Sequence, residues 1–187
     1  MKTRYFLFII VCMLLALSGC AKKGTLFPVS ADKTVTVMAP IINTADEEIG
    51  EATFTETSEG MTIDIVAEGL TPGMHGTHIH EKGECAPPSF ESAGAHFNPT
   101  EKEHGFKNPK GFHLGDLPNI EVGSDGRVNV SLRLTDITLK KDVENSILDS
   151  DGSALIIHEK ADDNITDPSG NSGDRIACAA ITADMVK

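Results

Sequence analysis

The sequence predicts an all-β protein, a β-sandwich or a β-barrel, and three observations favour this fold class. Segments in which polar and apolar residues alternate recur along the chain, as expected for half-buried strands. Stretches rich in Gly, Asp, Asn and Pro separate these segments, and no segment shows a sustained helical period. With eight Phe, one Tyr and no Trp, the core must consist mainly of aliphatic side chains, which suit strands. The 187 residues suffice for one domain with its own core.

Seven strands are predicted along the chain. The first three, at residues 34–41, 52–59 and 61–70, form a β-meander with turns at residues 47–50 and 58–60. The other four are predicted at residues 76–81, 127–134, 153–159 and 175–182. Two connections are unusually long, residues 85–119 and residues 160–174. Long loops on a β-scaffold usually carry function.

The first 19 residues predict an export signal. Lys2 and Arg4 precede an apolar run that is too short to span a bilayer comfortably. The run ends in Leu17-Ser18-Gly19-Cys20, which resembles a bacterial lipoprotein processing box. This resemblance implies cleavage before Cys20, acylation of its sulfur, and a lipid-anchored protein on the extracytoplasmic face of a bacterial cell membrane. A soluble secreted form is the alternative.

The chain is therefore predicted to have three parts: a lipoprotein signal peptide (residues 1–19), a lipidated cysteine with a flexible tether (residues 20–33), and a β-domain (residues 34–187). The net charge is −12, and removal of the signal would leave 14 basic and 28 acidic residues, a net charge of −14. This acidity argues against nucleic acid as a partner. It also repels anionic substrates at long range, so anion chemistry needs a local positive centre.

Two cysteines, Cys85 and Cys178, remain in the predicted domain. Disulfides persist in exported proteins, and pairing these two residues is the economical interpretation. Metal-bound thiolates are the alternative, although neither residue has a nearby cysteine partner.

Six of the seven histidines form a pattern that predicts metal binding. In the strand at residues 76–81, alternation places His78 and His80 on one face, a spacing that suits one metal ion. His75 points to the other face and is predicted to be a hydrogen-bonded core residue. His158 lies on a distant strand beside a charged turn.

A second group lies in the first long loop, which can curl so that its polar side chains meet. Three nitrogens and one oxygen from His96, His104, His113 and Asp116 fit tetrahedral zinc. The alternative is a chance scatter of surface histidines.

At these residues the sequence resembles the Cu/Zn superoxide dismutase family. The matching segments are HGTHIHEKGEC, SAGAHFNPTEKEHG, FHLGDLPN, IIHEKADD and GNSGDRIAC, and the resemblance covers residues 34–187. It implies a Greek-key β-barrel of eight strands, related to the immunoglobulin-like sandwich, with two long functional loops. It also implies copper bound by His78, His80, His96 and His158, zinc bound by His96, His104, His113 and Asp116, and an imidazole of His96 shared by both metals.

The resemblance further implies a function. Two superoxide anions and two protons become dioxygen and hydrogen peroxide through a copper redox cycle, in which His96 takes a proton, while zinc has a structural and tuning role. Arg175 matches the substrate-guiding arginine of the family, and Asp162 matches the carboxylate that links a copper ligand to a zinc ligand. Asp163 is interpreted as a solvated loop charge. The loop at residues 161–174 contains no lysine, so weak long-range guidance is expected.

Two other functions fit parts of the pattern. The same fold could buffer copper or zinc outside the cell, but complete copper ligation together with Arg175 favours the enzyme. A zinc-dependent hydrolase lacks an evident general base beside an open zinc position. The sequence leaves the oligomeric state open.

Overall fold

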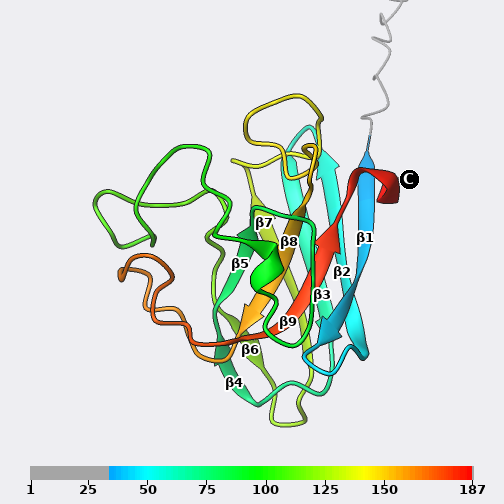
Figure 1. Ribbon diagram of the computed structural model, residues 1–187, viewed down its shortest axis with the longest axis vertical. Helices are drawn as coiled ribbons and strands as arrows, with labels where there is room; N and C mark the ends of the chain where they lie inside the picture. The colour runs from blue at the N-terminus through cyan, green and yellow to red at the C-terminus, as the bar shows by residue number, and fades with distance from the viewer. Residues whose placement is uncertain (1–33, 187) are drawn as a thin grey trace, which may run out of the picture. The chain divides into compact units, whose positions relative to one another are not determined.

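The computed structural model describes residues 34–186, which form two antiparallel sheets (Figure 1). Within this range the strands are β1 (Val35–Asn43), β2 (Glu48–Thr57), β3 (Gly60–Ala67), β4 (Gly73–His75), β5 (Thr77–His80), β6 (Ile120–Val122), β7 (Val128–Leu134), β8 (Ser153–His158) and β9 (Arg175–Ile181). Two single-turn 3₁₀ helices complete this part of the chain, η1 (Glu91–Ala93) and η2 (Ala183–Met185). The predicted signal peptide, the tether and Cys20 lie outside the described residues.

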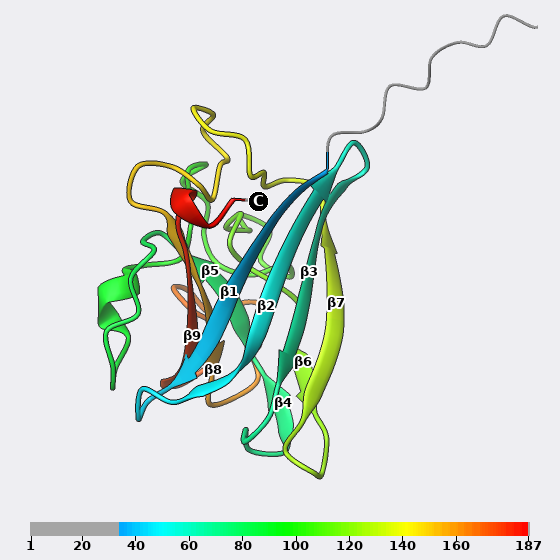
Figure 2. The ribbon, with the colours of Figure 1, turned by 90° about the vertical axis from the view of Figure 1, so that its right-hand side faces the viewer.

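Seven strands form one curled sheet in the order β5-β8-β9-β1-β2-β3-β7, and β4 pairs with β6 in a second, small sheet. Figure 2 shows the large sheet curving around the interior of the molecule. The last strand, β9, lies between β8 and β1, so the end of the chain is built into the middle of the sheet. The predicted all-β fold class is confirmed. Residues 34–186 contain no helix that is long and apolar enough to cross a membrane.

Alternation in the first strands accounts for the core. On β1, Val37, Ala39 and Ile41 are fully buried, and the facing β2 contributes Ala52 and Phe54. The residues between them, Met38 and Pro40 on β1 and Thr53 on β2, are more exposed, as the period of a strand requires. Twenty-six buried apolar residues form one continuous core, to which the strands and loop residues such as Phe97 and Leu117 both contribute, so burial of apolar surface stabilises the scaffold and the loops together.

The turn predicted at residues 47–50 is wrong. The chain reverses at residues 44–46, and β2 already begins at Glu48. The Asn43 side-chain oxygen accepts the N–H groups of Ala45 (2.9 Å) and Glu47 (3.0 Å), and Asp46 adopts a left-handed backbone with φ 64°. Short polar side chains such as those of Asn43 and Asp46 favour turns. The turn therefore forms at these residues and not at Glu47 and Glu48, whose charges suggested a turn further along the chain.

The nine strands exceed the eight implied by the resemblance because a three-residue strand precedes the histidine strand. Gly76 separates β4 from β5, which pair with different sheets. The Gly76 N–H donates to the Lys160 carbonyl and its own carbonyl accepts the His158 N–H, both at 2.8 Å. A side chain at this corner would meet the Cβ of Ser172 at 3.0 Å and that of Asp162 at 3.2 Å. Gly76 therefore lets one extended segment turn between two sheets.

A third long connection, residues 135–152, lies between two predicted strands but was not singled out from the sequence. Its anchor is Glu56, a buried residue of β2 whose carboxylate accepts Thr138 Oγ1–H and Leu139 N–H, both at 2.6 Å. Ile147 and Leu148 of the same connection are buried in the main core. The connection is therefore packed onto the sheet by a polar anchor and by apolar contacts.

Candidate metal centre

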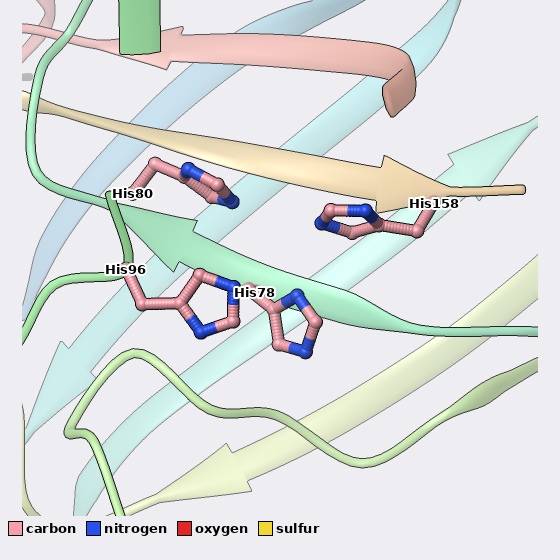
Figure 3. Close-up of side chains that lie close together, drawn as sticks. All are labelled: His78, His80, His96 and His158. Carbon is pink, nitrogen blue, oxygen red and sulfur yellow. The ribbon is translucent and has the colours of Figure 1, made fainter. Parts of the chain in front are cut away.

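The four predicted copper ligands converge from three parts of the chain. His78 and His80 lie on β5, His158 ends the neighbouring strand β8, and His96 comes from the first long loop, which pairs with β5 through an isolated bridge from His96 to His80. Figure 3 shows their rings facing a common point. All four side chains are buried, and one ligand atom from each lies within 4.8 Å of the others.

Each of these four rings has one engaged nitrogen and one nitrogen without a hydrogen-bond partner. The engaged contacts are His78 Nε2 to Asp162 (2.8 Å), His80 Nδ1 to the Gly94 carbonyl (3.0 Å), His96 Nδ1 to Asp116 (2.9 Å) and His158 Nδ1 to the Gly173 carbonyl (3.1 Å). The unpartnered atoms are His78 Nδ1, His80 Nε2, His96 Nε2 and His158 Nε2. Buried polar atoms are normally paired, so four converging lone pairs fit a metal ion, and an all-imidazole set suits copper.

The predicted zinc ligands surround one carboxylate oxygen. Asp116 Oδ1 lies 2.9 Å from His96 Nδ1, 2.9 Å from His104 Nδ1 and 3.2 Å from His113 Nδ1. Asp116 Oδ2 accepts the backbone N–H groups of Gly105 (2.9 Å) and His113 (3.1 Å), which fixes the carboxylate. Three imidazole nitrogens and one carboxylate oxygen are a donor set suited to tetrahedral zinc.

His96 belongs to both groups, with Nδ1 turned toward Asp116 and Nε2 toward the copper ligands. A ligand atom of His78 also lies within 4.8 Å of those of His96, His104 and Asp116. However, the two nitrogens of His78 are already assigned, one to Asp162 and one to the other group. His113 therefore fits the zinc group better than His78.

Burial keeps the four rings of the copper group (His78, His80, His96 and His158) neutral. It lowers the pKa of His96 to about 4 and that of His158 to about 3, and it also lowers the pKa values of His78 and His80. Neutral imidazole is the form that binds a metal. These four rings are therefore available as ligands at neutral pH.

His104 differs because two carboxylates face its ring. Burial alone would lower the pKa of His104, but hydrogen bonds to Asp116 and Asp162 raise it to about 9. Burial would raise the pKa values of these carboxyl groups, yet their hydrogen bonds with histidines hold both well below the usual range. A metal ion in the zinc group therefore has to displace a proton from His104.

Asp162 connects the two groups as the resemblance implies. Its carboxylate contacts His78 Nε2 at 2.8 Å and His104 Nε2 at 3.0 Å. The Asn119 side chain holds the backbone on both sides of this carboxylate, accepting the Asp162 N–H (2.8 Å) and donating to the Asp162 carbonyl (2.9 Å). Asp162 is thus fixed before any metal binds.

Arg175 lies beside the copper group and is anchored by backbone carbonyls. It is the register partner of His158, and its guanidinium donates to the Phe90 carbonyl (2.6 Å) and the Gly94 carbonyl (2.7 Å). Burial lowers its pKa somewhat, but an arginine remains charged at neutral pH. The predicted disulfide between Cys85 and Cys178 is present, with a Cα–Cα distance of 5.8 Å. It fastens the loop that carries both carbonyls to β9.

An open cavity of about 1070 Å³ leads to this centre. Its lining includes His80, His96, His158 and Arg175, and two lysines outside the lysine-free residues 161–174, Lys82 and Lys102. Six carboxylates line the same cavity: Glu81, Glu103, Glu144, Asp149, Asp151 and Asp167. The positive charge at the opening is therefore confined to a few side chains, which carboxylates surround.

The comparisons with known proteins identify the family. A family model described as copper/zinc superoxide dismutase matches residues 48–181. The chain belongs to the copper/zinc superoxide dismutase family. Superoxide dismutase-like protein YojM of Bacillus subtilis (strain 168) is 48% identical over 183 residues, covering 92% of this chain and 93% of that protein. Superoxide dismutase (Cu-Zn) 2 of Aquifex aeolicus (strain VF5) is 46% identical over 161 residues, covering 84% and 94%.

Solved structures agree with this family. A double mutant of a SOD-like protein from Bacillus subtilis, in which a tyrosine and a proline are replaced by histidine, has a TM-score of 0.76 and 53% identity, covering 78% of this chain and 97% of that chain. Cu/Zn superoxide dismutase from Brucella abortus has a TM-score of 0.63 and 29% identity, covering 78% and 99%.

In this dismutase-family protein, the contacts of Asp163 and Asn119 go beyond what the sequence predicted. Asp163 is exposed, but it is not merely a solvated charge: it accepts hydrogen bonds from Ile165, Thr166 and Asn171, which lower its pKa to about 2 and organise the second loop. Asn119 was given no role, although it is the last residue of the matching segment FHLGDLPN. His75 is confirmed as a hydrogen-bonded core residue, with its ring nitrogens 2.7 Å from the carbonyls of Thr71 and His158.

Proposed function

We propose that the protein is a superoxide dismutase, which converts two superoxide anions and two protons into dioxygen and hydrogen peroxide. One observation carries this proposal. Four unpartnered imidazole nitrogens converge beside a guanidinium that lines the same open cavity. A protein that only buffers metal needs the ligands but has no use for an anchored cation next to them, whereas an enzyme for an anionic substrate needs both.

His78, His80, His96 and His158 would hold copper, which would supply one-electron chemistry, and His96, His104, His113 and Asp116 would hold zinc, which would help to fix the ring of His96. The protein positions both sets through its own hydrogen bonds. The carbonyls of Gly94 and Gly173 hold protons on the outer nitrogens of His80 and His158, so their inner lone pairs face the cavity.

Two further residues serve the substrate. His96 Nε2 faces the copper group and can hold a proton there, while Nδ1 stays on the zinc side. Arg175 attracts the anion over the last few ångströms, where solvent screens its charge least. The overall charge of −12 makes this local attraction necessary.

The test is the rate of superoxide decay with protein loaded with both metals. We expect a second-order acceleration that falls in Arg175→Ala, falls further in Arg175→Glu and is partly restored in Arg175→Lys, all at equal metal content. Loaded wild-type protein that leaves superoxide decay unchanged would remove the proposed activity. Equal rates for the Ala, Glu and wild-type forms would remove the guiding role of Arg175.

We also propose that the protein is exported and held at the extracytoplasmic face of a bacterial membrane by a lipid on Cys20. The processing box at residues 17–20 supports this proposal, and the disulfide suits an oxidising compartment. Mass spectrometry of the membrane fraction should find a diacylated N-terminal Cys20, and Cys20→Ser should abolish the modification. An unmodified N-terminus on the mature membrane-fraction protein would contradict the anchor.

A further inference from the structure

Gly94 provides one carbonyl oxygen that serves two parts of the centre. It accepts a hydrogen bond from His80 Nδ1 at 3.0 Å and another from Arg175 Nη2 at 2.7 Å. Because a carbonyl only accepts, the first bond keeps the proton of His80 on Nδ1 and leaves the lone pair of Nε2 on the copper side. The second bond fixes where the guanidinium lies. The direction of this carbonyl therefore sets the orientation of a copper ligand and of the guiding cation together.

The same peptide unit is held at its other end by Glu81. The Ala95 N–H, which shares a plane with the Gly94 carbonyl, donates to Glu81 Oε1 at 3.1 Å. In a planar trans peptide the N–H and C=O point in opposite directions, so a group that holds the N–H also aims the carbonyl. The Glu81 N–H donates to the Ala95 carbonyl at 2.9 Å, which keeps the carboxylate next to this peptide.

Glu81 also fills the space that a side chain on Gly94 would occupy. Gly94 has a left-handed backbone with φ 77° and ψ −151°. A Cβ placed on it would meet Glu81 Cγ at 2.7 Å and Glu81 Oε1 at 2.5 Å. The glycine and the carboxylate thus fit each other sterically as well as through the hydrogen bond.

We propose that Glu81 is a positioning residue, whose carboxylate holds the Ala95 N–H and thereby aims the Gly94 carbonyl at His80 and Arg175. The inference rests on the proposed function, because it takes His80 as a copper ligand and Arg175 as the guide for an anion. It assigns a role to a carboxylate whose negative charge would by itself only oppose an anionic substrate, since Glu81 lines the opening.

If Glu81 has this positioning role, the length of the side chain at position 81 matters and its charge does not. Glu81→Asp keeps the charge but shortens the side chain by one methylene, so its carboxylate no longer reaches the Ala95 N–H. Glu81→Gln keeps an acceptor oxygen at the same reach and removes the charge. Glu144→Gln is the matched control, because Glu144 is exposed, lines the same opening and takes no part in the contacts described above.

The experiment uses the full chain loaded with copper and zinc, with metal content and thermal unfolding measured for each variant. The readouts are the visible and electron paramagnetic resonance spectra of Cu(II) and the affinity of the site for azide, a small anion that needs no turnover. We expect Glu81→Asp to shift the Cu(II) spectra and to weaken azide binding about fivefold, the effect of losing roughly one hydrogen bond. Glu81→Gln should keep the wild-type spectra.

Two results would overturn the proposal. One is Glu81→Asp with wild-type spectra and azide affinity. The other is Glu81→Gln with altered spectra, which would make charge the decisive property of this residue. A loaded wild-type protein without superoxide activity would instead count against the proposed function, because spectra and azide binding report the position of His80 and Arg175 without superoxide.

Discussion

His96 is the residue that belongs to both candidate metal groups. Its two ring nitrogens face different donor sets, one beside Asp116 and one among the unpartnered nitrogens of the copper group. His113 and His158 each belong to one set only. Substitution of these three residues therefore separates a shared ligand from unshared ones.

We expect His96→Ala to lower the affinity for both metals, His113→Ala chiefly that for zinc, and His158→Ala chiefly that for copper. Each loss should exceed the 10–100-fold typical of residues that only support a ligand. Titrations of metal-free protein with each metal measure these affinities. If His96→Ala left either affinity unchanged, the ring would not be shared.

Burial of the histidines also predicts how the stability of the metal-free protein depends on pH. The folded-state pKa values of His96 and His158, about 4 and about 3, lie below the unfolded value near 6.5. At pH values between the folded-state and unfolded-state pKa values, these histidines are protonated in the unfolded chain and neutral in the folded protein, so stability falls as the pH falls. For His104, whose pKa is raised to about 9, the contribution is complete below pH 6.5 and is lost as the pH rises through 9.

Urea unfolding of metal-free protein from pH 7 to pH 4.5 should show this loss. Each of the two buried rings contributes up to roughly 1.4 kcal/mol per pH unit in this window. His158→Asn removes one titrating group and should reduce the slope. A free energy of unfolding that stays constant from pH 7 to pH 4.5 would contradict the prediction.

At the scale of elements, the strands and the places of two long loops were largely predictable, whereas the packing of the loops was not. All seven predicted strands are present. Alternation reveals the buried face of β1, β2 and β3 directly, whereas every position of β5 and β8 is buried. The strands β4 and β6 were missed, since three residues are too few to show a period. The packing of the connection at residues 135–152 was not predicted because its main polar anchor, Glu56, is 79 residues upstream of the first residue of that connection and resembles any other strand glutamate in the sequence.

In the candidate metal centre, the side chains that could bind metal were predictable, but the backbone groups that orient them were not. The candidate ligands could be selected from the sequence because imidazoles and a carboxylate recur at positions that resemble a family. The groups that orient the rings could not, because backbone carbonyls such as those of Gly94 and Gly173 have no signature in the sequence. Their positions depend on how two distant loops pack against β5 and β8.

Glu56 provides a test of the third connection. Glu56→Gln replaces one carboxylate oxygen, which accepts a hydrogen bond, by an amide NH₂, which cannot accept one. A buried donor then lacks its acceptor, which lowers the free energy of unfolding by about 1–3 kcal/mol. We expect residues 135–152 to exchange their amide hydrogens faster while both metals stay bound. The matched control is Glu59→Gln, which removes an exposed ion pair with Arg133 and should cost less than about 1 kcal/mol. Equal destabilisation by the two variants would show that Glu56 is not an anchor.

At the scale of the whole molecule, the charge opposes the substrate. The chain carries −12, and carboxylates outnumber cations around the opening six to three. At about 0.01 M salt the screening length is about 30 Å, so superoxide experiences the whole negative field; at about 0.1 M it is about 10 Å and local cations dominate.

We therefore expect the second-order rate to rise as salt increases from about 0.01 to about 0.1 M. Lys102→Gln should make this rise steeper, because it removes one of the three cations at the opening. Superoxide decay at several salt concentrations, with metal content held equal, measures both effects. A steep fall in rate with salt would show that long-range attraction operates despite the negative charge.

The order of strands in the large sheet has a consequence for when the two metal groups can form. The zinc group comes from residues 96–116, a stretch of 21 residues, whereas the copper group needs His78 and His158, which are 80 residues apart on neighbouring strands. Closing the longer loop costs more chain entropy and requires β8 to dock. During refolding, zinc should therefore be captured early and copper only after the C-terminal strands have joined the sheet. Stopped-flow refolding with a separate probe for each metal would reveal the sequence of events, and copper capture preceding zinc capture would refute it.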